Sequence, residues 1–202
     1  AELLQRATLL SNLAIVRLHH PDASANIAPQ ALLRQSLEIK KHLFGGTHPT
    51  VVANLATLAQ SYQGVDYEEC VKCFKELLDV QLECYGEHSI QVATTYGKLS
   101  SVYLMGAKLA NSTTTTTTTR YEAAIACLLK VQQYQQMICS IGNGNGNGNA
   151  DTNTNTNLAA HNGNVQMLEH TKAAIGKIRG LLREQQKAVE DLNNGDDDDD
   201  DN

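Results

Sequence analysis

The sequence has few aromatic residues and few prolines. Aromatic side chains account for 4% of the 202 residues, Trp is absent, and Pro occurs only three times. Because proline interrupts helices, its scarcity favours long helical segments. Hydrophobic residues still reach 42%, so the core must be built mainly from aliphatic side chains, as in closely packed helices. The composition predicts an all-α fold with enough residues for a sizeable core.

An excess of positive charge and a long apolar run are also missing. Residues 196–201 are all Asp, and their six negative charges equal the net charge of −6, so the rest of the chain is neutral. A neutral body offers no electrostatic footprint for nucleic acid. No segment approaches the roughly 18 apolar residues that cross a bilayer. We predict no nucleic-acid partner and no membrane partner. The chain begins with Ala1 rather than Met, and we expect it to be a fragment.

Five cysteines, an odd number, lie within helical patterns. This pattern is typical of free thiols in a reducing compartment and predicts a cytoplasmic protein. Cys70 and Cys73 have the C-x-x-C spacing of a zinc or redox site, but no second pair accompanies them. Cys73 and Cys127 occupy matching positions in successive units, where a buried Cys acts as a small hydrophobe. We predict no metal site, no cofactor and no catalytic residue.

The chain contains an internal repeat. Leu58 and Tyr62 recur 41 residues later as Leu99 and Tyr103, and a small residue follows each Leu. These positions share one stripe of a helix, and the small residue allows a neighbouring helix to approach closely. A second helical pattern follows each first one and ends at a glycine, which is a common helix stop: Gly45, Gly86 and Gly142.

An earlier unit has the same pattern, with a second helix at residues 31–44. The sequence therefore predicts an α-solenoid of about three helix pairs over residues 1–142. Two low-complexity segments interrupt it: an insert at 107–119 that contains seven consecutive Thr, and a Gly/Asn/Thr linker at 143–164. We predict that both are disordered loops, because neither can bury enough apolar surface to offset the entropy of ordering.

A last helix is predicted at residues 165–193, followed by a disordered acidic tail at 194–202. Apolar residues alternate at spacings of three and four along the helix, as in a heptad seam, but Thr171, Gln185, Gly176 and Gly180 weaken it. Two interpretations stay open. The helix could cap the end of the solenoid, or it could form a short coiled coil with a partner or with itself.

Residues 36–55 have the sequence SLEIKKHLFGGTHPTVVANL, which resembles the join between repeats in the kinesin light chain type of tetratricopeptide (TPR) proteins. The Tyr-Glu-Glu-Cys motif at 67–70 is also similar to that family. The sequence Gly-Glu-His-Ser at 86–89 is similar to its Gly…His-Pro join, with Ser89 in place of Pro. The resemblance covers residues 7–142. It implies a TPR-like solenoid in which His48 and His88 stand where the first helices begin.

The resemblance also implies a binding groove lined by the first helix of each pair. Carrying the family's groove positions over to this sequence gives small or polar residues that could admit a peptide backbone and hydrogen-bond to it. They are Thr8, Ser11, Asn12, Ile15, Ala56, Gln60, Gln63, Thr94, Lys98 and Ser101. Alternatively, these are solvated or packed small residues with no binding role.

Together these observations predict a non-catalytic scaffold or cargo-adaptor segment, similar to kinesin light chain, that binds a protein or peptide partner in the groove. The alternative is a regulatory or sensor repeat region of a larger enzyme or signalling protein. The final helix offers a second contact if it pairs with a coiled-coil partner.

Overall fold

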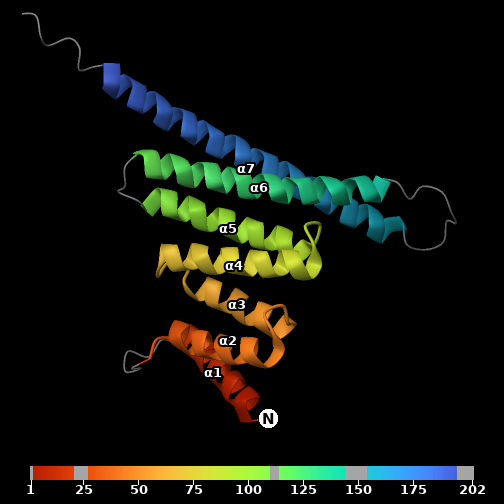
Figure 1. The fold of residues 1–202 in the computed structure, drawn as a ribbon. Coiled ribbons are helices and arrows are strands. Elements are labelled where there is room, and N and C mark those ends of the chain that lie inside the picture. Colours follow the sequence, from red (N-terminus) through yellow and green to blue (C-terminus); the bar gives the residue numbers. More distant parts are fainter. Residues whose placement is uncertain (1, 21–26, 110–113, 144–153, 195–202) are drawn as a thin grey trace, which may run out of the picture. The chain divides into compact units, whose positions relative to one another are not determined.

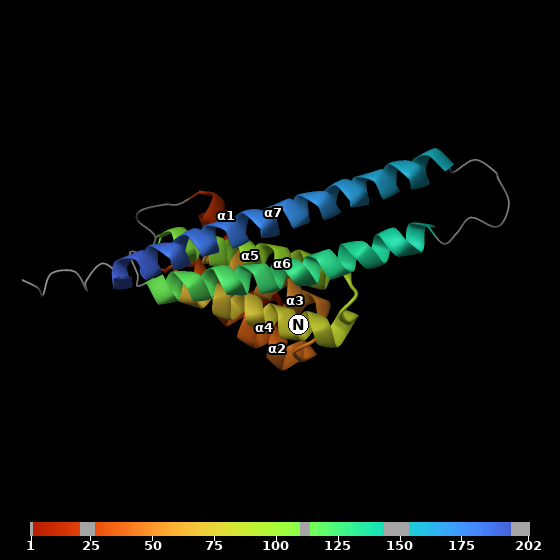
Figure 2. The same ribbon diagram turned by 90° about the horizontal axis from the view of Figure 1, so that it is seen from above.

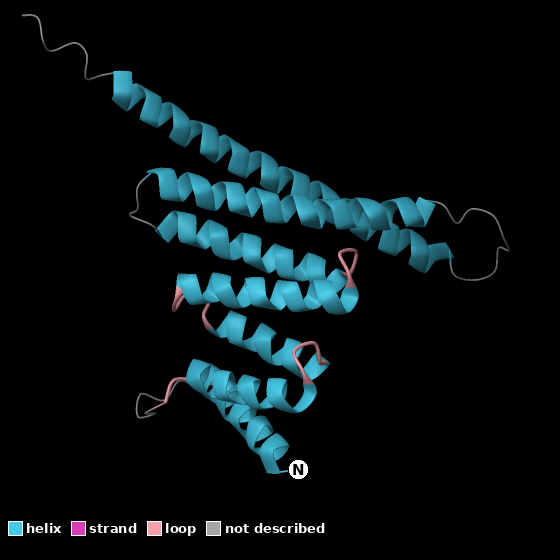
Figure 3. Cartoon of the chain, viewed as in Figure 1, coloured by secondary structure: helices cyan, strands magenta, loops and turns pink. Residues whose placement is uncertain are grey.

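The computed structural model describes residues 2–20, 27–109, 114–143 and 154–194, and these ranges contain helices and loops but no strand (Figures 1 and 3). The prediction of an all-α fold is confirmed. The described residues form seven helices: α1 (Glu2–His19), α2 (Pro29–Phe44), α3 (Pro49–Ser61), α4 (Tyr67–Tyr85), α5 (Ile90–Leu109), α6 (Thr114–Asn143) and α7 (Thr154–Asn194). The chain divides into two compact units, Ala1–Thr95 (unit 1) and Tyr96–Asn202 (unit 2), and α5 spans the division.

In unit 1 each helix packs on the next one along the chain, from α1 to α4. The second helices of the pairs, α2 and α4, bury the same four positions at a spacing of 41 residues. These are Leu32, Leu33, Ser36 and Leu37 in α2 and Cys73, Phe74, Leu77 and Leu78 in α4. Packing between successive neighbours with a constant repeat spacing is the arrangement of a solenoid, in which no helix buries its apolar side alone.

Ion pairs also join α2 to α4. Arg34 pairs with Glu69, and Lys41 Nζ lies 2.6 Å from Glu76 Oε1. Arg34 additionally donates from Nε to the Tyr62 hydroxyl at 3.0 Å and lies over the Tyr62 ring. The two pairs share a spacing of 35 residues and lie seven residues apart on each helix, so they follow one stripe. Their side chains are partly exposed, so each ion pair adds little stability and mainly fixes the alignment of the helices.

The first helices begin with a side-chain cap at the same repeat position. His48 precedes α3, and its Nδ1 accepts a hydrogen bond from the backbone N–H of Thr50 at 3.2 Å. Ser89 precedes α5, 41 residues later, and its Oγ accepts from the N–H of Val92 at 3.3 Å. The prediction of a helix-start role is confirmed for His48. It is wrong for His88, because the 41-residue spacing aligns His48 with Ser89 rather than with His88.

Replacing His48 with Ala is expected to lower the free energy of unfolding by about 1 kcal/mol, because a backbone N–H of α3 loses its acceptor. The ring of His48 also stacks on Phe44, with ring centroids 4.5 Å apart. His48→Ser should recover most of the capping contribution, since Ser89 performs this role in the next repeat. Urea unfolding of the two variants followed by circular dichroism would measure the difference. Equal losses for Ala and Ser would show that the cap contributes nothing.

The threonine-rich insert is not a loop where the structure describes it. Residues 114–119 form the first turns of α6, and α5 continues through 107–109, so α5 has 20 residues where α3 has 13. Thr117 and Ala107 are buried, and Arg120 donates from Nη1 to the carbonyl of Gly106 at 2.7 Å. The prediction of a disordered insert at 107–119 was therefore wrong for these residues, because contacts between α5 and α6 stabilise the added turns.

The hairpin of α6 and α7 is longer than predicted. α6 continues through Gly142 to Asn143, so Gly142 does not end it, and α7 begins at Thr154 rather than near Val165. Of the predicted linker, residues 154–164 are therefore helical, whereas 144–153 lie outside the described residues, as do residues 195–202 of the predicted acidic tail. The two helices pack against each other and cross obliquely (Figures 1 and 2).

The core of unit 2 is formed by side chains from three helices. Ala107 of α5, Tyr121 of α6 and Ile178 of α7 are buried together. Partly buried leucines and Ile125 surround them, including Leu181 and Leu182 of α7. The heptad seam predicted for α7 therefore faces α5 and α6 over this stretch, where Ile175 is also buried. Whether the seam also contacts a coiled-coil partner remains a hypothesis.

Candidate protein-binding surface

A chain of buried hydrogen bonds fixes α1 and α3 against α2. Lys40 donates to the Ser11 hydroxyl at 2.9 Å, and the Ser11 and Ser36 hydroxyls lie 2.7 Å apart. Ser36 donates to the carbonyl of Ala7 at 2.7 Å and accepts from Asn54 Nδ2 at 3.0 Å. Because the Ser36 proton points to Ala7, Ser11 must be the donor between the two hydroxyls. Burial lowers the pKa of Lys40.

This hydrogen-bond chain removes Ser11 from the predicted groove. Ser11 is buried between α1 and α2, where its hydroxyl accepts from Lys40 and donates to Ser36. The assignment of Ser11 as a groove residue was therefore wrong. Its small size serves the close approach of two helices. A serine that satisfies buried polar neighbours has a structural role, because leaving those neighbours unpaired would be costly.

The other predicted groove residues of unit 1 are accessible. Thr8, Asn12 and Ile15 of α1 are exposed, as are Gln60 of α3 and Gln63 in the turn that follows it, while Ala56 is half-buried. Thr94 of α5 is exposed and donates to the carbonyl of Ile90 at 2.7 Å. In unit 2, Lys98 is half-buried, and the exposed Ser101 donates to the carbonyl of Gly97 at 3.2 Å. Within unit 1, no described hydrogen bond connects the seven side chains with one another, and the shared binding role of all nine residues stays a prediction.

Burial in α1 indicates a different alignment of its exposed face. The buried residues of α1 are Ala7, Ser11 and Ala14. The α3 residues that lie 44 positions later are buried too: Val51, Leu55 and Leu58. With this 44-residue spacing, the accessible positions of α3 correspond to α1 positions that each lie one residue after a predicted groove position. We call the two stripes together the first-helix face. It consists of Leu9, Asn12, Leu13 and Val16 in α1 and Ala53, Ala56, Thr57 and Gln60 in α3.

The first-helix face changes character along its length. At α1 it is apolar, with Leu9 68% exposed and Val16 56% exposed. At α3 it consists of small side chains, one hydroxyl and one amide. None of the eight residues carries a charge. The sequence signal that identifies the α1 stripe is the spacing of Ala7, Ser11 and Ala14, small residues four and three apart, which marks the packed side of the helix.

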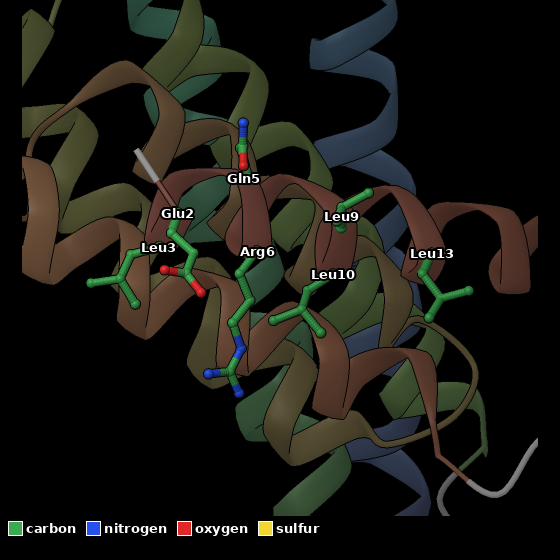
Figure 4. A pocket seen from close by; sticks show the side chains of 7 residues that line it. All are labelled: Glu2, Leu3, Gln5, Arg6, Leu9, Leu10 and Leu13. Atoms are coloured by element: carbon green, nitrogen blue, oxygen red, sulfur yellow. The ribbon is translucent and has the colours of Figure 1, made fainter.

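A shallow depression also runs along α1. It has a volume of about 560 Å³ and is lined only by residues of this helix (Figure 4): Glu2, Leu3, Gln5, Arg6, Leu9, Leu10 and Leu13. Leu3 and Leu13 are 47% and 43% exposed. The depression is lined by four leucines and by Glu2, Gln5 and Arg6, so this side of α1 combines apolar with polar and charged side chains.

Cys70 and Cys73 lie in the core of unit 1. Both are buried in α4, and the Cys70 thiol donates to the carbonyl of Ala59 at 3.4 Å. Burial raises the pKa of both thiols, that of Cys70 to about 11. Across the described ranges, no three His, Cys, Asp or Glu side chains are grouped so that they could hold a metal ion. The pair therefore has the environment of packing residues rather than that of a reactive dithiol.

We expect Cys70 and Cys73 to react with a thiol reagent at pH 8 only as fast as unit 1 opens. A thiol with a pKa of about 11 has almost no thiolate at this pH, and burial adds a steric barrier. Cys84 and Cys139 are partly exposed and should react first. Mass spectrometry of the time course would give the order, and early modification of Cys70 would contradict its assignment to the core.

Comparisons with known proteins give structural neighbours only. No protein-family model matches the sequence, and no curated protein matches it. Among solved structures, BtubC (BKLC) from P. vanneervenii has 16% identity and a TM-score of 0.44, over 88% of this chain and 64% of BtubC. Kinesin light chain-like, nearly identical TPR-like repeats from Podospora anserina have 12% identity and a TM-score of 0.42, over 93% of this chain and 96% of theirs.

A single-substitution variant of the same Podospora repeats has 11% identity and a TM-score of 0.44, over 94% of this chain and 99% of its own. The Podospora structures are of the repeat type that residues 36–55 resemble. The helical fold is established by the helices of this chain and their packing, independently of these structural neighbours. In the described residues, no helix is long and apolar enough to span a bilayer.

Proposed function

We propose that unit 1 is a protein-binding module whose partner lies on the first-helix face. The observation that carries this proposal is the exposure of apolar side chains on α1, with Leu9 68% and Val16 56% exposed, beside accessible small and amide side chains on α3. Exposed apolar residues that follow one stripe of a helix are typical of interaction surfaces. In this proposal the chain acts as a non-catalytic scaffold or cargo-adaptor segment, as its resemblance to kinesin light chain repeats implies.

The chemistry of the face favours a peptide or helix that presents apolar side chains. Leu9, Leu13 and Val16 can contact such side chains, and burying them on binding supplies the main driving force. Ala53 and Ala56 leave room for a backbone, and the Gln60 amide can both donate to it and accept from it. Because the face carries no charge, binding by long-range attraction to an acidic peptide is not expected.

The test compares the partners captured by the purified chain with those captured by two single variants. Gln60→Arg places a bulky charge on the first-helix face. Gln35→Arg makes the same substitution at an exposed position of α2, which is a second helix. We expect Gln60→Arg to reduce capture of a specific partner by on the order of tenfold, as for a moderate interface residue, with an unchanged melting temperature.

Gln35→Arg should retain the partner that Gln60→Arg loses. Leu9→Arg should be compared in the same way. If it reduces capture of the same partner and leaves the melting temperature unchanged, α1 belongs to the same surface. If all variants retain the same partners at wild-type levels, the first-helix face is not the binding surface.

A further inference from the structure

α7 carries three basic side chains on one exposed side of the helix. Arg179, Arg183 and Lys187 follow each other at spacings of four, so they are neighbours along about 12 Å of the helix axis. All three are exposed, and in the part of the chain that the structure describes none of them has an ion-pair or hydrogen-bond partner. We call these three residues the basic stripe.

The surface beside the basic stripe is open. The packed side of α7 is marked by the buried residues Ile175 and Ile178. Gly180 lies three residues before Arg183, and a Cβ added to it would meet no described side chain or neighbouring helix within 4 Å. An extended chain segment therefore has room to lie along the stripe.

The acidic residues of α7 do not pair with the stripe. Glu169 is engaged by Lys172, whose Nζ lies 2.8 Å from its Oε1. Glu184, Glu190 and Asp191 are exposed, and none of them forms a described ion pair with the stripe. A ligand that pairs with the stripe would therefore present carboxylates from outside α7.

Six consecutive carboxylates follow α7 in the sequence. Residues 196–201 are all Asp, Gly195 separates them from Asn194 at the end of α7, and residues 195–202 lie outside the described residues. The end of the helix is unfavourable for this charge, because its carbonyl groups give it a partial negative charge and its last turn contains no basic residue. The nearest cations along α7 are those of the basic stripe.

The segment is long enough to reach the stripe. At a rise of about 1.5 Å per residue, Asn194 lies about 10 Å beyond Lys187 and about 22 Å beyond Arg179 along the helix axis. The seven residues 195–201 span up to about 24 Å when they are extended. Gly195 can adopt the backbone conformations of a chain reversal without steric cost.

We propose that the acidic segment, residues 196–201, folds back and pairs with the basic stripe of the same chain. Covalent attachment gives the segment an effective concentration in the millimolar range, so a separate acidic peptide or a second copy must compete with it. Each exposed ion pair is weak, and the contact is sensitive to salt. The stripe is thus a docking surface for acidic segments that the chain's own carboxylates occupy. This inference concerns unit 2 and does not depend on the function proposed for unit 1.

A labelled peptide with the sequence of residues 194–202 tests the proposal as a competitor. At about 20 mM NaCl, it should bind at least about tenfold more tightly to a variant with Asp→Asn at all six positions 196–201 than to the unaltered chain, because the variant leaves the stripe free. In about 1 M NaCl, where the Debye length is about 3 Å, both affinities should be lost. Fluorescence anisotropy would measure the binding.

The stripe itself is tested by charge reversal in the Asp→Asn variant. Lys187→Glu should lower the affinity for the peptide by about tenfold, because it replaces an attractive charge with a repulsive one. The matched control is Lys177→Glu, which makes the same change at an exposed position two residues before Arg179 and so on the opposite side of the helix. It should change the affinity by less than about threefold. Circular dichroism would check that both variants keep the same helix content.

Three results would overturn the proposal. If the unaltered chain and the Asp→Asn variant bind the peptide equally, or neither binds it, the acidic segment does not occupy the stripe. Equal losses for Lys187→Glu and Lys177→Glu would show a diffuse attraction to the whole helix rather than pairing with the stripe. Association of the unaltered chain that rises with concentration and disappears in the Asp→Asn variant, measured by sedimentation equilibrium, would place the acidic segment on a second copy.

Discussion

Replacing Phe74 with Ala is expected to lower the free energy of unfolding of unit 1 by about 3–5 kcal/mol, the range for deleting a large buried aromatic side chain. Phe74 is 0% exposed and is the largest fully buried side chain of the described residues. It belongs to the set of four α4 positions that match the buried set of α2 after 41 residues. Removing the ring leaves a cavity that rigid neighbouring helices cannot fill.

The loss would be measured by urea unfolding followed by circular dichroism. Val65→Ala is a suitable control, because Val65 is 72% exposed and lies in the turn before α4. Its effect should stay within about 0.5 kcal/mol, as for other surface positions. A Phe74→Ala variant that is as stable as Val65→Ala would mean that α4 does not pack as described.

Replacing Ser36 with Ala is expected to cost about 2–3 kcal/mol, because buried hydrogen-bonding groups lose their partner. The Ser36 hydroxyl is 0% exposed, donates to Ala7 and accepts from both Ser11 and Asn54. The substitution removes little volume, so most of the loss comes from unsatisfied polar groups rather than from a cavity. The Oδ1 of Asn54 has no hydrogen-bond partner, so Asn54 would lose the one side-chain hydrogen bond described for it.

A matched control is Ser101→Ala, because Ser101 is exposed and bonds only to the carbonyl of Gly97, four residues earlier. It should change stability by less than about 0.5 kcal/mol. A double-mutant cycle of Ser36→Ala with Asn54→Ala should then give a coupling of about 1 kcal/mol, since the two side chains share one hydrogen bond. Independent effects of the two substitutions would show that the described contact between α2 and α3 does not contribute to stability.

The sequence was sufficient to predict unit 1 because its repeat is carried by buried residues. The 41-residue spacing seen at Leu58 and Leu99 also relates the buried positions of α2 and α4, and glycines end both helices. Gly45 and Gly86 have φ angles of 83° and 75°, which favour glycine, and both donate to the carbonyl four residues earlier. Local pattern and tertiary packing agree at these positions, which is why prediction from pattern succeeds there.

The predictions failed where composition and packing disagree. The threonine run has low helix propensity and no apolar pattern, yet residues 114–119 are helical because α6 packs against α5 and α7. In α1, apolar residues occur on every side, so hydrophobic periodicity could not identify the packed side. The packed side is identified by the small residues Ala7, Ser11 and Ala14. With this side facing α2, the exposed stripe of α1 lies one residue after the predicted groove positions.

The fold of unit 1 depends most on the mutual stabilisation of its helices. Native-state hydrogen exchange tests it directly, because the exchange of each buried amide reports the free energy of the opening that exposes it. We expect the buried amides of α2, α3 and α4 to share one opening free energy, and we expect Phe74→Ala to lower it by the same amount in all three helices. If Phe74→Ala speeds exchange only within α4, while α2 and α3 keep their wild-type rates, the helices do not form one stacked unit.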